Sequence, residues 1–318
     1  MPQNNNPANN SANNPATNLS RRSALTLLAA ATAATAIDAA LPSPLHADPN
    51  PDWTTPLPPF RIAGNLYYVG SRDLASYIIT TTSGHILINS NLATSPAQIR
   101  ASVEKLGFRW KEVKILLISH AHYDHCAGSA QILRETGAKY MVMDGDVPVI
   151  ESGGKTDFQY GSRADFLYPP AKVSRILHDR DLVSLGDVNI IARKTAGHTK
   201  GCTTWTMTVR GDGKLYVAVI VGSPNVNPGY NLIHDPKYPQ MAADYAAGFR
   251  TLKSLPCDLF LGAHGLYFDL LAKNAKPKTA STNPFVDPTG YRDYVTEREQ
   301  AFEKELAKQR AHPLRVHD

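Results

Sequence analysis

The stretch from Val113 to His125 reads VKILLISHAHYDH and decides the fold of this chain. Its first half is an apolar run that predicts a buried β-strand. Its second half places three histidines and one aspartate within six residues. Because a strand end is a rigid support, such a cluster can hold metal ligands in fixed geometry. Imidazole together with carboxylate suits zinc better than calcium or magnesium, which prefer oxygen ligands.

The spacing within this cluster indicates two groups of ligands. His120 and His122 are two residues apart, so on extended backbone their side chains point to the same side. Asp124 and His125 follow where the chain must turn toward a predicted helix, and the turn lets this pair face a second metal ion. The alternatives are a structural metal site, or histidines satisfied by hydrogen bonds. Structural zinc sites are usually closed and rich in cysteine, and no cysteine stands among these spaced ligands.

The composition is that of a globular protein. The chain has 318 residues, of which 42% are hydrophobic and 19% charged, and one large domain or two small ones would fit this length. The formal net charge is +5. Basic residues do not form a run, and the aromatic residues are not interleaved with them, so we do not expect nucleic-acid binding.

The first 47 residues have the pattern of an export signal. Arg21 and Arg22 precede an apolar run, residues 25–36, and a small-residue cleavage site follows at residues 45–47. This order predicts a cleaved signal of the twin-arginine type and a periplasmic or secreted protein. The alternatives are a disordered tail or a lone membrane helix. The apolar run is shorter than the roughly 20 residues of a membrane span, so we expect no stable membrane anchor.

Strand and helix signals alternate after the Pro-rich segment 48–60, which indicates one α/β (α+β) domain over residues 61–318. Its two halves are alike, and two sheets packed face to face with helices outside account for both, with the metals at the seam. The expected strands are residues 65–69, 76–80, 86–88, 113–118, 140–143, 188–193, 203–209, 215–221 and 259–261. The expected helices are residues 96–106, 131–135 and 241–255, and one from Pro288 that Asp287 caps.

Two isolated histidines are placed to complete the metal site. His198 and His264 each follow a predicted strand and lie beside glycine, which permits a tight turn and close approach. Each alone is more often an ordinary loop histidine, but the cluster favours ligation. Six others have no such setting and are expected at the surface or in linkers: His46, His85, His178, His234, His312 and His317.

The three cysteines, Cys126, Cys202 and Cys257, leave at least one thiol without an intramolecular partner. For Cys126 and Cys202, a buried small hydrophobic side chain is the favoured interpretation. A Cys126–Cys202 bridge, or a thiolate near zinc, stays open on spacing alone.

With these residues in place, the chain resembles the metallo-β-lactamase superfamily. The resemblance rests on the cluster from His120 to His125, on Gly197-His198-Thr199 and on His264, and it covers essentially the whole mature chain. Further segments resemble subclass B3: Tyr168-Pro169-Pro170-Ala171, Thr203-Thr204-Trp205, Pro228-Gly229-Tyr230, Tyr238-Pro239 and Leu255-Pro256-Cys257-Asp258. The resemblance implies a four-layer αββα sandwich with two zinc ions at the edge of the sheets.

The resemblance also implies the ligand sets and the reaction. The first zinc is expected on His120, His122 and His198, and the second on Asp124, His125 and His264. Ser223 stands where many related hydrolases carry an aspartate that bridges both metals, which favours a β-lactamase. A shared hydroxide would attack the lactam carbonyl, and Asp124 would orient it or handle a proton. The alternatives are a lactonase or thioesterase on the same scaffold, or a non-catalytic zinc-binding protein.

The substrate contacts rest on weaker patterns. Ser223 and Asn225 could bind the carboxylate of a β-lactam, or they could only close the turn that follows. Phe158 and Tyr160, with Phe166, lie on a loop that could cover the pocket, or they could pack locally. We expect a small-molecule β-lactam as the partner and a monomer. Asn89 replaces the aspartate usual in the family, which predicts altered support around the metal ligands.

Overall fold

Seven strands form the first sheet, in the order β1-β2-β3-β4-β5-β6-β7. The computed structural model describes residues 50–279 and 282–312, so the predicted export signal lies outside the described residues. The strands are β1 (Phe60–Ala63), β2 (Leu66–Tyr68), β3 (Tyr77–Thr81), β4 (Gly84–Ile88), β5 (Val113–Leu117), β6 (Lys139–Met143) and β7 (Arg175–Leu177). The first four pair antiparallel, and β4 to β7 pair parallel. Parallel pairing aligns the carboxyl ends of β4 and β5 at one edge of the sheet, where the histidine cluster begins.

Five strands form the second sheet, in the order β12-β11-β10-β9-β8. They are β8 (Leu182–Leu185), β9 (Val188–Lys194), β10 (Thr203–Gly211), β11 (Lys214–Val221) and β12 (Leu259–Gly262). The turn between β10 and β11 is a tight hairpin: Asp212 and Gly213 both have positive φ, 52° and 75°. A two-residue loop with this backbone matches the twist of the strands that it joins.

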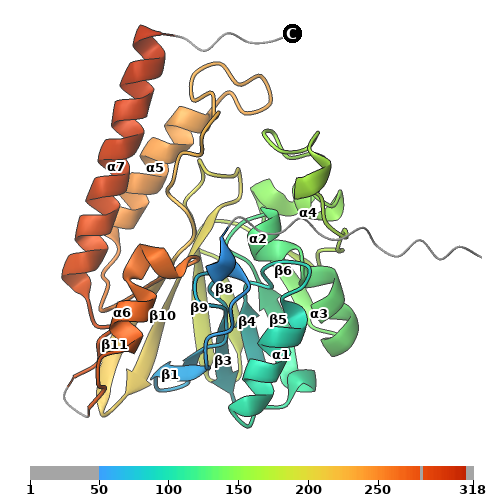
Figure 1. Cartoon of the computed structure of the whole chain (residues 1–318), viewed down its shortest axis with the longest axis vertical. Coiled ribbons are helices and arrows are strands. Elements are labelled where there is room, and N and C mark those ends of the chain that lie inside the picture. Colours follow the sequence, from blue (N-terminus) through green and yellow to red (C-terminus); the bar gives the residue numbers. More distant parts are fainter. Residues whose placement is uncertain (1–49, 280–281, 313–318) are drawn as a thin grey trace, which may run out of the picture. The chain divides into compact units, whose positions relative to one another are not determined.

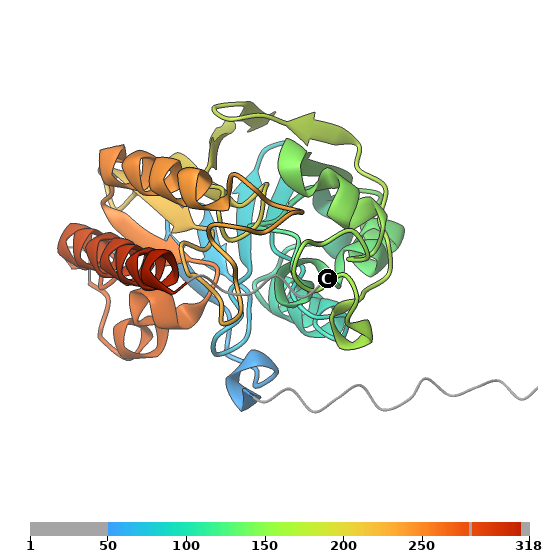
Figure 2. The same ribbon diagram turned by 90° about the horizontal axis from the view of Figure 1, so that it is seen from above.

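Helices cover both outer faces of the paired sheets (Figures 1 and 2). The α-helices are α1 (Pro96–Lys105), α2 (Tyr123–Cys126), α3 (Ser129–Thr136), α4 (Val147–Glu151), α5 (Met241–Ser254), α6 (Leu270–Asn274) and α7 (Pro288–Ala311). The short 3-10 helices are Pro51–Trp53, Trp110–Glu112, Asp144–Asp146, Ala164–Phe166 and Gly265–Phe268. One core lies between the sheets and extends to α5 and α7, and a second lies between the first sheet and helices α1 and α3. This is the four-layer αββα sandwich that the resemblance implied.

Most predicted elements are confirmed, and the misses are short. The nine predicted strands and four predicted helices match observed elements with shifts at their ends. Asp287 caps α7 as expected, accepting a hydrogen bond from the backbone N–H of Gly290 at 2.8 Å. Six elements of three to five residues each were not predicted from the sequence: β1, β7, β8, α2, α4 and α6. Elements of this length carry too few residues for a periodic pattern.

The expectation that His85 lies at the surface is wrong. Its side chain is buried, with its ring 5.3 Å from the ring of Phe108 and Nε2 3.6 Å from a Glu112 carboxylate oxygen. Burial lowers the pKa of His85. Successive side chains of β4 point alternately into the two cores. His85 points to the same side as Leu87, into the core between the first sheet and helices α1 and α3. His178, His234 and His312 are exposed, and His46 and His317 lie outside the described residues.

Within the described residues, none of the helices combines the length and apolar character that crossing a membrane requires.

Candidate metal centre

All the predicted metal ligands follow the carboxyl ends of strands from both sheets. His120 to His125 follow β5 and enter α2, His198 lies between β9 and β10, and His264 follows β12. Parallel pairing of β11 with β12 brings His264 to the sheet edge where β11 ends, and there it meets His125 and Asp124 of the cluster. The seam between the sheets therefore gathers side chains separated by up to 144 residues in sequence, from His120 to His264.

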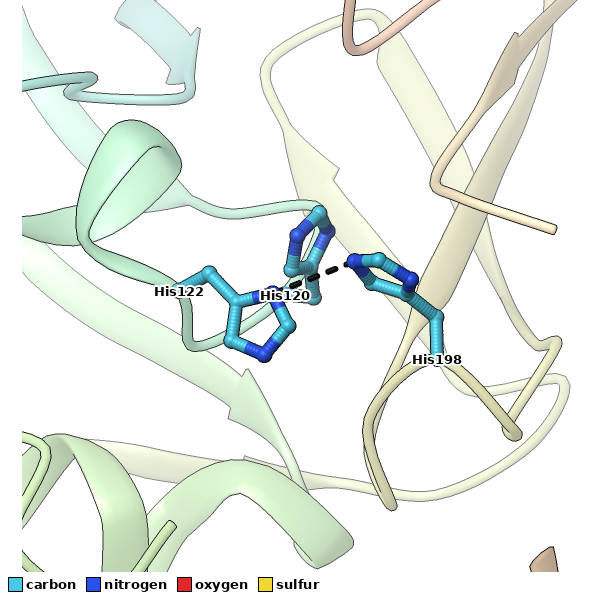
Figure 3. A group of neighbouring side chains, drawn as sticks. All are labelled: His120, His122 and His198. Atoms are coloured by element: carbon cyan, nitrogen blue, oxygen red, sulfur yellow. Dashed lines mark hydrogen bonds between the residues drawn. The ribbon is translucent and has the colours of Figure 1, made fainter. Parts of the chain in front are cut away.

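The first ligand set consists of His120, His122 and His198, whose rings converge from two loops (Figure 3). Nδ1 of His122 lies 3.1 Å from Nε2 of His198. One possible ligand atom from each of the three side chains lies within 4.8 Å of the others, and all three residues are buried. Tetrahedral zinc with nitrogen ligands at 2.0–2.1 Å would separate two of them by about 3.3 Å. The first set thus has the spacing that a zinc ion requires.

The second ligand set consists of Asp124, His125 and His264. Nε2 of His125 lies 3.1 Å from Nε2 of His264. The Asp124 carboxylate oxygen Oδ2 lies 3.2 Å from the first of these atoms and 3.4 Å from the second. Three donor atoms at such mutual distances form one face of a tetrahedron around a zinc ion. His120 also lies within 4.8 Å of Asp124 and His125, so the two sets adjoin.

Hydrogen bonds outside the sets fix which ring nitrogen faces each set. Nδ1 of His198 donates to the backbone carbonyl of Asn225 at 2.8 Å. Nδ1 of His264 donates to the carboxylate of Asp73 at 2.9 Å. Because each Nδ1 carries a proton, each Nε2 can present a lone pair to its set, as a metal ligand must. The donor sets therefore fit zinc in chemistry as well as in spacing.

The two sets differ in charge. Burial lowers the pKa of His122 to about 4 and, with the neighbouring His122 ring, that of His198 to about 3. These imidazoles are neutral at pH 7, the form that binds metal. Burial also lowers the pKa of His264, but hydrogen bonds to Asp124 and Asp73 outweigh it and raise the value to about 9. The second set thus combines a carboxylate with an imidazole whose basicity the neighbouring carboxylates raise, which favours a bound cation.

Trp53 and Asp73 support the second set, and neither was predicted from the sequence. The indole Nε1 of Trp53 donates at 2.9 Å to the same Asp73 oxygen that His264 contacts. The other oxygen of Asp73 accepts from the backbone N–H of Leu266 at 3.0 Å. Trp53 belongs to the Pro-rich segment 48–60, which was set apart from the catalytic domain, yet its ring lies 5.8 Å from that of His264.

Asp146 joins the two loops that carry the first set, and it too was missed. Its carboxylate accepts hydrogen bonds from the N–H of Ala121 at 2.8 Å, the hydroxyl of Thr199 at 2.9 Å and the N–H of Gly201 at 2.8 Å. Ala121 separates His120 from His122, and Thr199 follows the third ligand. Burial raises the pKa of Asp146 to about 7, and the three hydrogen bonds oppose that rise.

Gly197 lets the loop of the third histidine approach α5. Its φ is +134°, and a Cβ atom there would lie 2.5 Å from the ring of Tyr245.

Asn89 supports the start of the cluster. Its Oδ1 accepts from the N–H of Ser119 at 2.7 Å, and its Nδ2 donates to the carbonyl of Ala75 at 3.1 Å. An amide can donate as well as accept, whereas an ionised carboxylate only accepts.

The predicted substrate contacts fall in three different environments. Ser223 and Asn225 lie beside the metal ligands: the Ser223 hydroxyl is 3.1 Å from that of Tyr267, and the Asn225 amide donates to the same Tyr267 oxygen at 2.9 Å. Tyr160 is half-buried, with its ring 5.2 Å from that of His122. Phe158 is buried in the core against other aromatic rings.

Two other side chains complete the wall near the first set. Phe166 stacks on Tyr160 with ring centroids 4.4 Å apart. The carboxylate of Asp157, absent from the predicted site, lies 3.7 Å from Nε2 of His122. Asp157 lies far from His122 in the sequence, and no local pattern around it indicated a role at the site.

The three cysteines are free, so the structure does not contain the Cys126–Cys202 bridge. The Cys126 thiol donates to the backbone carbonyl of His122 at 3.0 Å. Cys202 accepts from the backbone N–H of Ser223 at 3.2 Å. Burial raises the pKa of both thiols, that of Cys202 to about 12. Both are neutral, small buried side chains rather than thiolates.

Comparison with known proteins agrees with this geometry. Residues 72–217 match the family model of the metallo-beta-lactamase superfamily. The native FEZ-1 metallo-beta-lactamase from Legionella gormanii is 51% identical, with a TM-score of 0.78 over 80% of this chain and 98% of its own. The class B3 di-zinc metallo-beta-lactamase LRA-12 from an Alaskan soil metagenome is 36% identical, with a TM-score of 0.77 over 81% and 97%. A probable metallo-hydrolase of Burkholderia pseudomallei is 30% identical over 114 residues, which cover 36% of this chain and 37% of that protein.

Proposed function

The chain belongs to the metallo-β-lactamase superfamily, and we propose that it is a zinc-dependent β-lactamase of subclass B3 that opens the amide bond of β-lactam antibiotics. The observation that carries the proposal is the pair of adjoining ligand sets at the seam of the sheets. Each set places donor atoms at zinc spacing, and hydrogen bonds from Asn225 and Asp73 fix the rings of His198 and His264. The likeness to solved β-lactamases over nearly their whole length supports the same activity.

We propose two zinc ions, the first on His120, His122 and His198 and the second on Asp124, His125 and His264. When bound, they would supply a water whose pKa falls to roughly 7 and a Lewis acid for the lactam carbonyl. The relative described as di-zinc supports two ions rather than one.

The residues of the chain would divide the remaining work. The Asp124 carboxylate belongs to the second set and also lies close to His120 of the first, so it can accept a hydrogen bond from the attacking water and carry a proton toward the lactam nitrogen. Ser223 and Asn225 present hydroxyl and amide groups beside the Tyr267 hydroxyl, whose ring adjoins that of His264, and there they can bind the substrate carboxylate. Tyr160 and Phe166 form an aromatic wall beside His122 that can pack against an apolar substituent.

The proposal extends to substrates and location. We propose that carbapenems, cephalosporins and penicillins are substrates, because hydrolysis by a metal-activated water needs no acyl-enzyme and acts on the amide bond that all three share. The protein would act as a monomer in the periplasm or outside the cell after removal of residues 1–47. It would neither bind nucleic acid nor carry a stable membrane anchor. The single catalytic domain would span residues 61–318.

Hydrolysis assays with metal analysis test the proposal. The purified protein should hydrolyse a carbapenem and a cephalosporin, lose activity with a chelator and regain it with zinc, and contain about two zinc ions. His122→Ala and His264→Ala should each lower zinc content and rate, whereas His234→Ala, a replacement of an exposed histidine, should change neither.

Two results would contradict the proposal. Turnover that persists after complete removal of metal would refute the zinc mechanism. Failure to hydrolyse any β-lactam with zinc restored would assign the site to another reaction, with lactones and thioesters as the next substrates to assay.

A further inference from the structure

The C-terminal helix α7 reaches the metal centre through one arginine. Nη1 of Arg298 donates to Oδ1 of Asn225 at 3.5 Å. Nη2 pairs with Glu297 toward solvent, and the side chain is 31% exposed. The guanidinium also lies over the ring of Tyr294, 5.9 Å from its centroid. Arg298 thus lies between the solvent and Asn225, a predicted substrate contact. It is far in sequence from the metal ligands and belongs to none of their motifs.

This contact favours one orientation of the Asn225 amide. A guanidinium only donates hydrogen bonds, so the atom that faces Arg298 must be the amide oxygen. The amide nitrogen Nδ2 then faces the Tyr267 hydroxyl and donates to its oxygen at 2.9 Å. The backbone carbonyl of Asn225 is fixed separately, because it accepts from His198 and from the hydroxyl of Tyr245 at 2.6 Å.

The Tyr267 hydroxyl transmits this orientation to Ser223. Its oxygen accepts from Asn225, so its own hydrogen needs an acceptor elsewhere. Among the residues that the structure describes, Ser223 Oγ lies within reach of it, at 3.1 Å. Tyr267 then donates and Ser223 accepts, which leaves the serine hydrogen directed away from Tyr267. The Tyr267 ring also lies 5.1 Å from that of His264 and stacks on Tyr294 of α7.

We propose that Arg298 is a specificity-determining residue: through Asn225 and Tyr267 it directs a chain of hydrogen bonds that leaves the Ser223 hydroxyl free to donate to the carboxylate of the substrate. The proposal rests on the proposed β-lactamase function and adds a positioning role for a residue of α7. The fixed positive charge of Arg298 acts in the same direction, because it favours an anionic group near Asn225. Its role is therefore in substrate binding and not in the chemical step.

The consequence is a change in KM with little change in kcat. Arg298→Met removes the donor and lets the Asn225 amide turn, so Ser223 donates to Tyr267 instead of to the substrate. We expect KM for a cephalosporin to rise about 10- to 100-fold, the loss expected for one hydrogen bond to an ionised group, with kcat within about 2-fold and zinc content unchanged. Arg298→Lys keeps a cationic donor and should recover most of the loss.

Three comparisons separate this role from a structural one. Arg292→Met removes an exposed arginine of the same helix and should leave KM unchanged. The same cephalosporin with its carboxylate masked as a methyl ester should show no difference between wild type and Arg298→Met. Tyr267→Phe breaks the chain one step further on, so adding Arg298→Met to it should raise KM by less than about 1.5-fold.

The outcomes are distinguishable. An active wild type with an unchanged KM in Arg298→Met, or with equal effects on the acid and its ester, refutes the inference alone. A fall in kcat together with zinc content assigns Arg298 a structural role and refutes it as well. A wild-type protein that hydrolyses no β-lactam refutes the proposed function, and this inference with it.

Discussion

Replacement of Asp146 offers the sharpest test of how the first ligand set is held together. The carboxylate is buried at 1% exposure and accepts three hydrogen bonds from the two loops that carry the set. One oxygen accepts from Ala121 and Thr199, and the other accepts from Gly201. Asp146→Asn keeps one acceptor atom and turns the other into a donor, whereas Asp146→Ala removes both.

The expected losses follow from the number of donors left without a partner. With its oxygen toward Ala121 and Thr199, the asparagine variant leaves one buried N–H, that of Gly201, opposite another donor. An unsatisfied buried group costs about 1–3 kcal/mol, so Asp146→Asn should lower the free energy of unfolding by that amount. Asp146→Ala leaves three donors unpaired and should cost about 3 kcal/mol or more. Both variants should also weaken zinc binding, because the loops of His120 and His198 are no longer tied together.

Urea unfolding monitored by circular dichroism gives the free energies, and competition with a chromophoric chelator gives the zinc affinities. Asp144→Asn is the matched control. It lies on the same 3-10 turn, but its carboxylate is partly exposed and pairs with Lys194 at 2.6 Å, so its loss should cost no more than about 1 kcal/mol. If Asp146→Ala is as stable as Asp144→Asn and binds zinc as tightly as wild type, the bridging role is wrong.

Trp53→Phe removes the indole donor to Asp73 and should weaken binding of one zinc equivalent about 10-fold by chelator competition; equal affinities for both equivalents would contradict this. Burial lowers the pKa of His85 below its unfolded value of about 6.5, so the unfolded chain binds more protons and stability falls as pH drops below 6.5. His85→Gln should reduce that slope by up to about 1.4 kcal/mol per pH unit in unfolding experiments, and identical slopes would count against it. Gly197→Ala should destabilise by about 1–3 kcal/mol and lower zinc content, whereas Gly107→Ala, with positive φ but no atom within 4 Å of the added Cβ, should keep full zinc content.

The sequence predicted the parts of the site that are local in the chain. The cluster after β5 was identified because its ligands lie within six residues, and the apolar run before it specified a buried strand. His198 and His264 could be added because each follows a strand and a glycine. These inferences need only the geometry of strands and turns, and the structure confirms where the elements bring these residues together.

The supporting residues could not be predicted for a physical reason. Trp53 reaches His264 through Asp73, and Arg298 reaches Ser223 through two other side chains. Such contacts depend on rotamers and on the packing of elements that are far apart in the chain. A tryptophan in a Pro-rich segment, or an arginine on the polar side of a long helix, looks the same in sequence whether or not it meets the site.

The arrangement of charge explains why two sets so close together can serve different purposes. His120, His122 and His198 are neutral at pH 7 because burial lowers their pKa values, so the first set leaves the charge of a bound dication undiminished for polarising a carbonyl. The second set includes Asp124, whose pKa is lowered by His125 and His264 despite its burial. Its negative charge offsets part of the charge of a dication and gives the nearby water a hydrogen-bond acceptor. Because that carboxylate belongs to the same short helix as His125, the order of residues in the cluster would determine, under the proposed function, which set polarises the substrate and which one handles the proton.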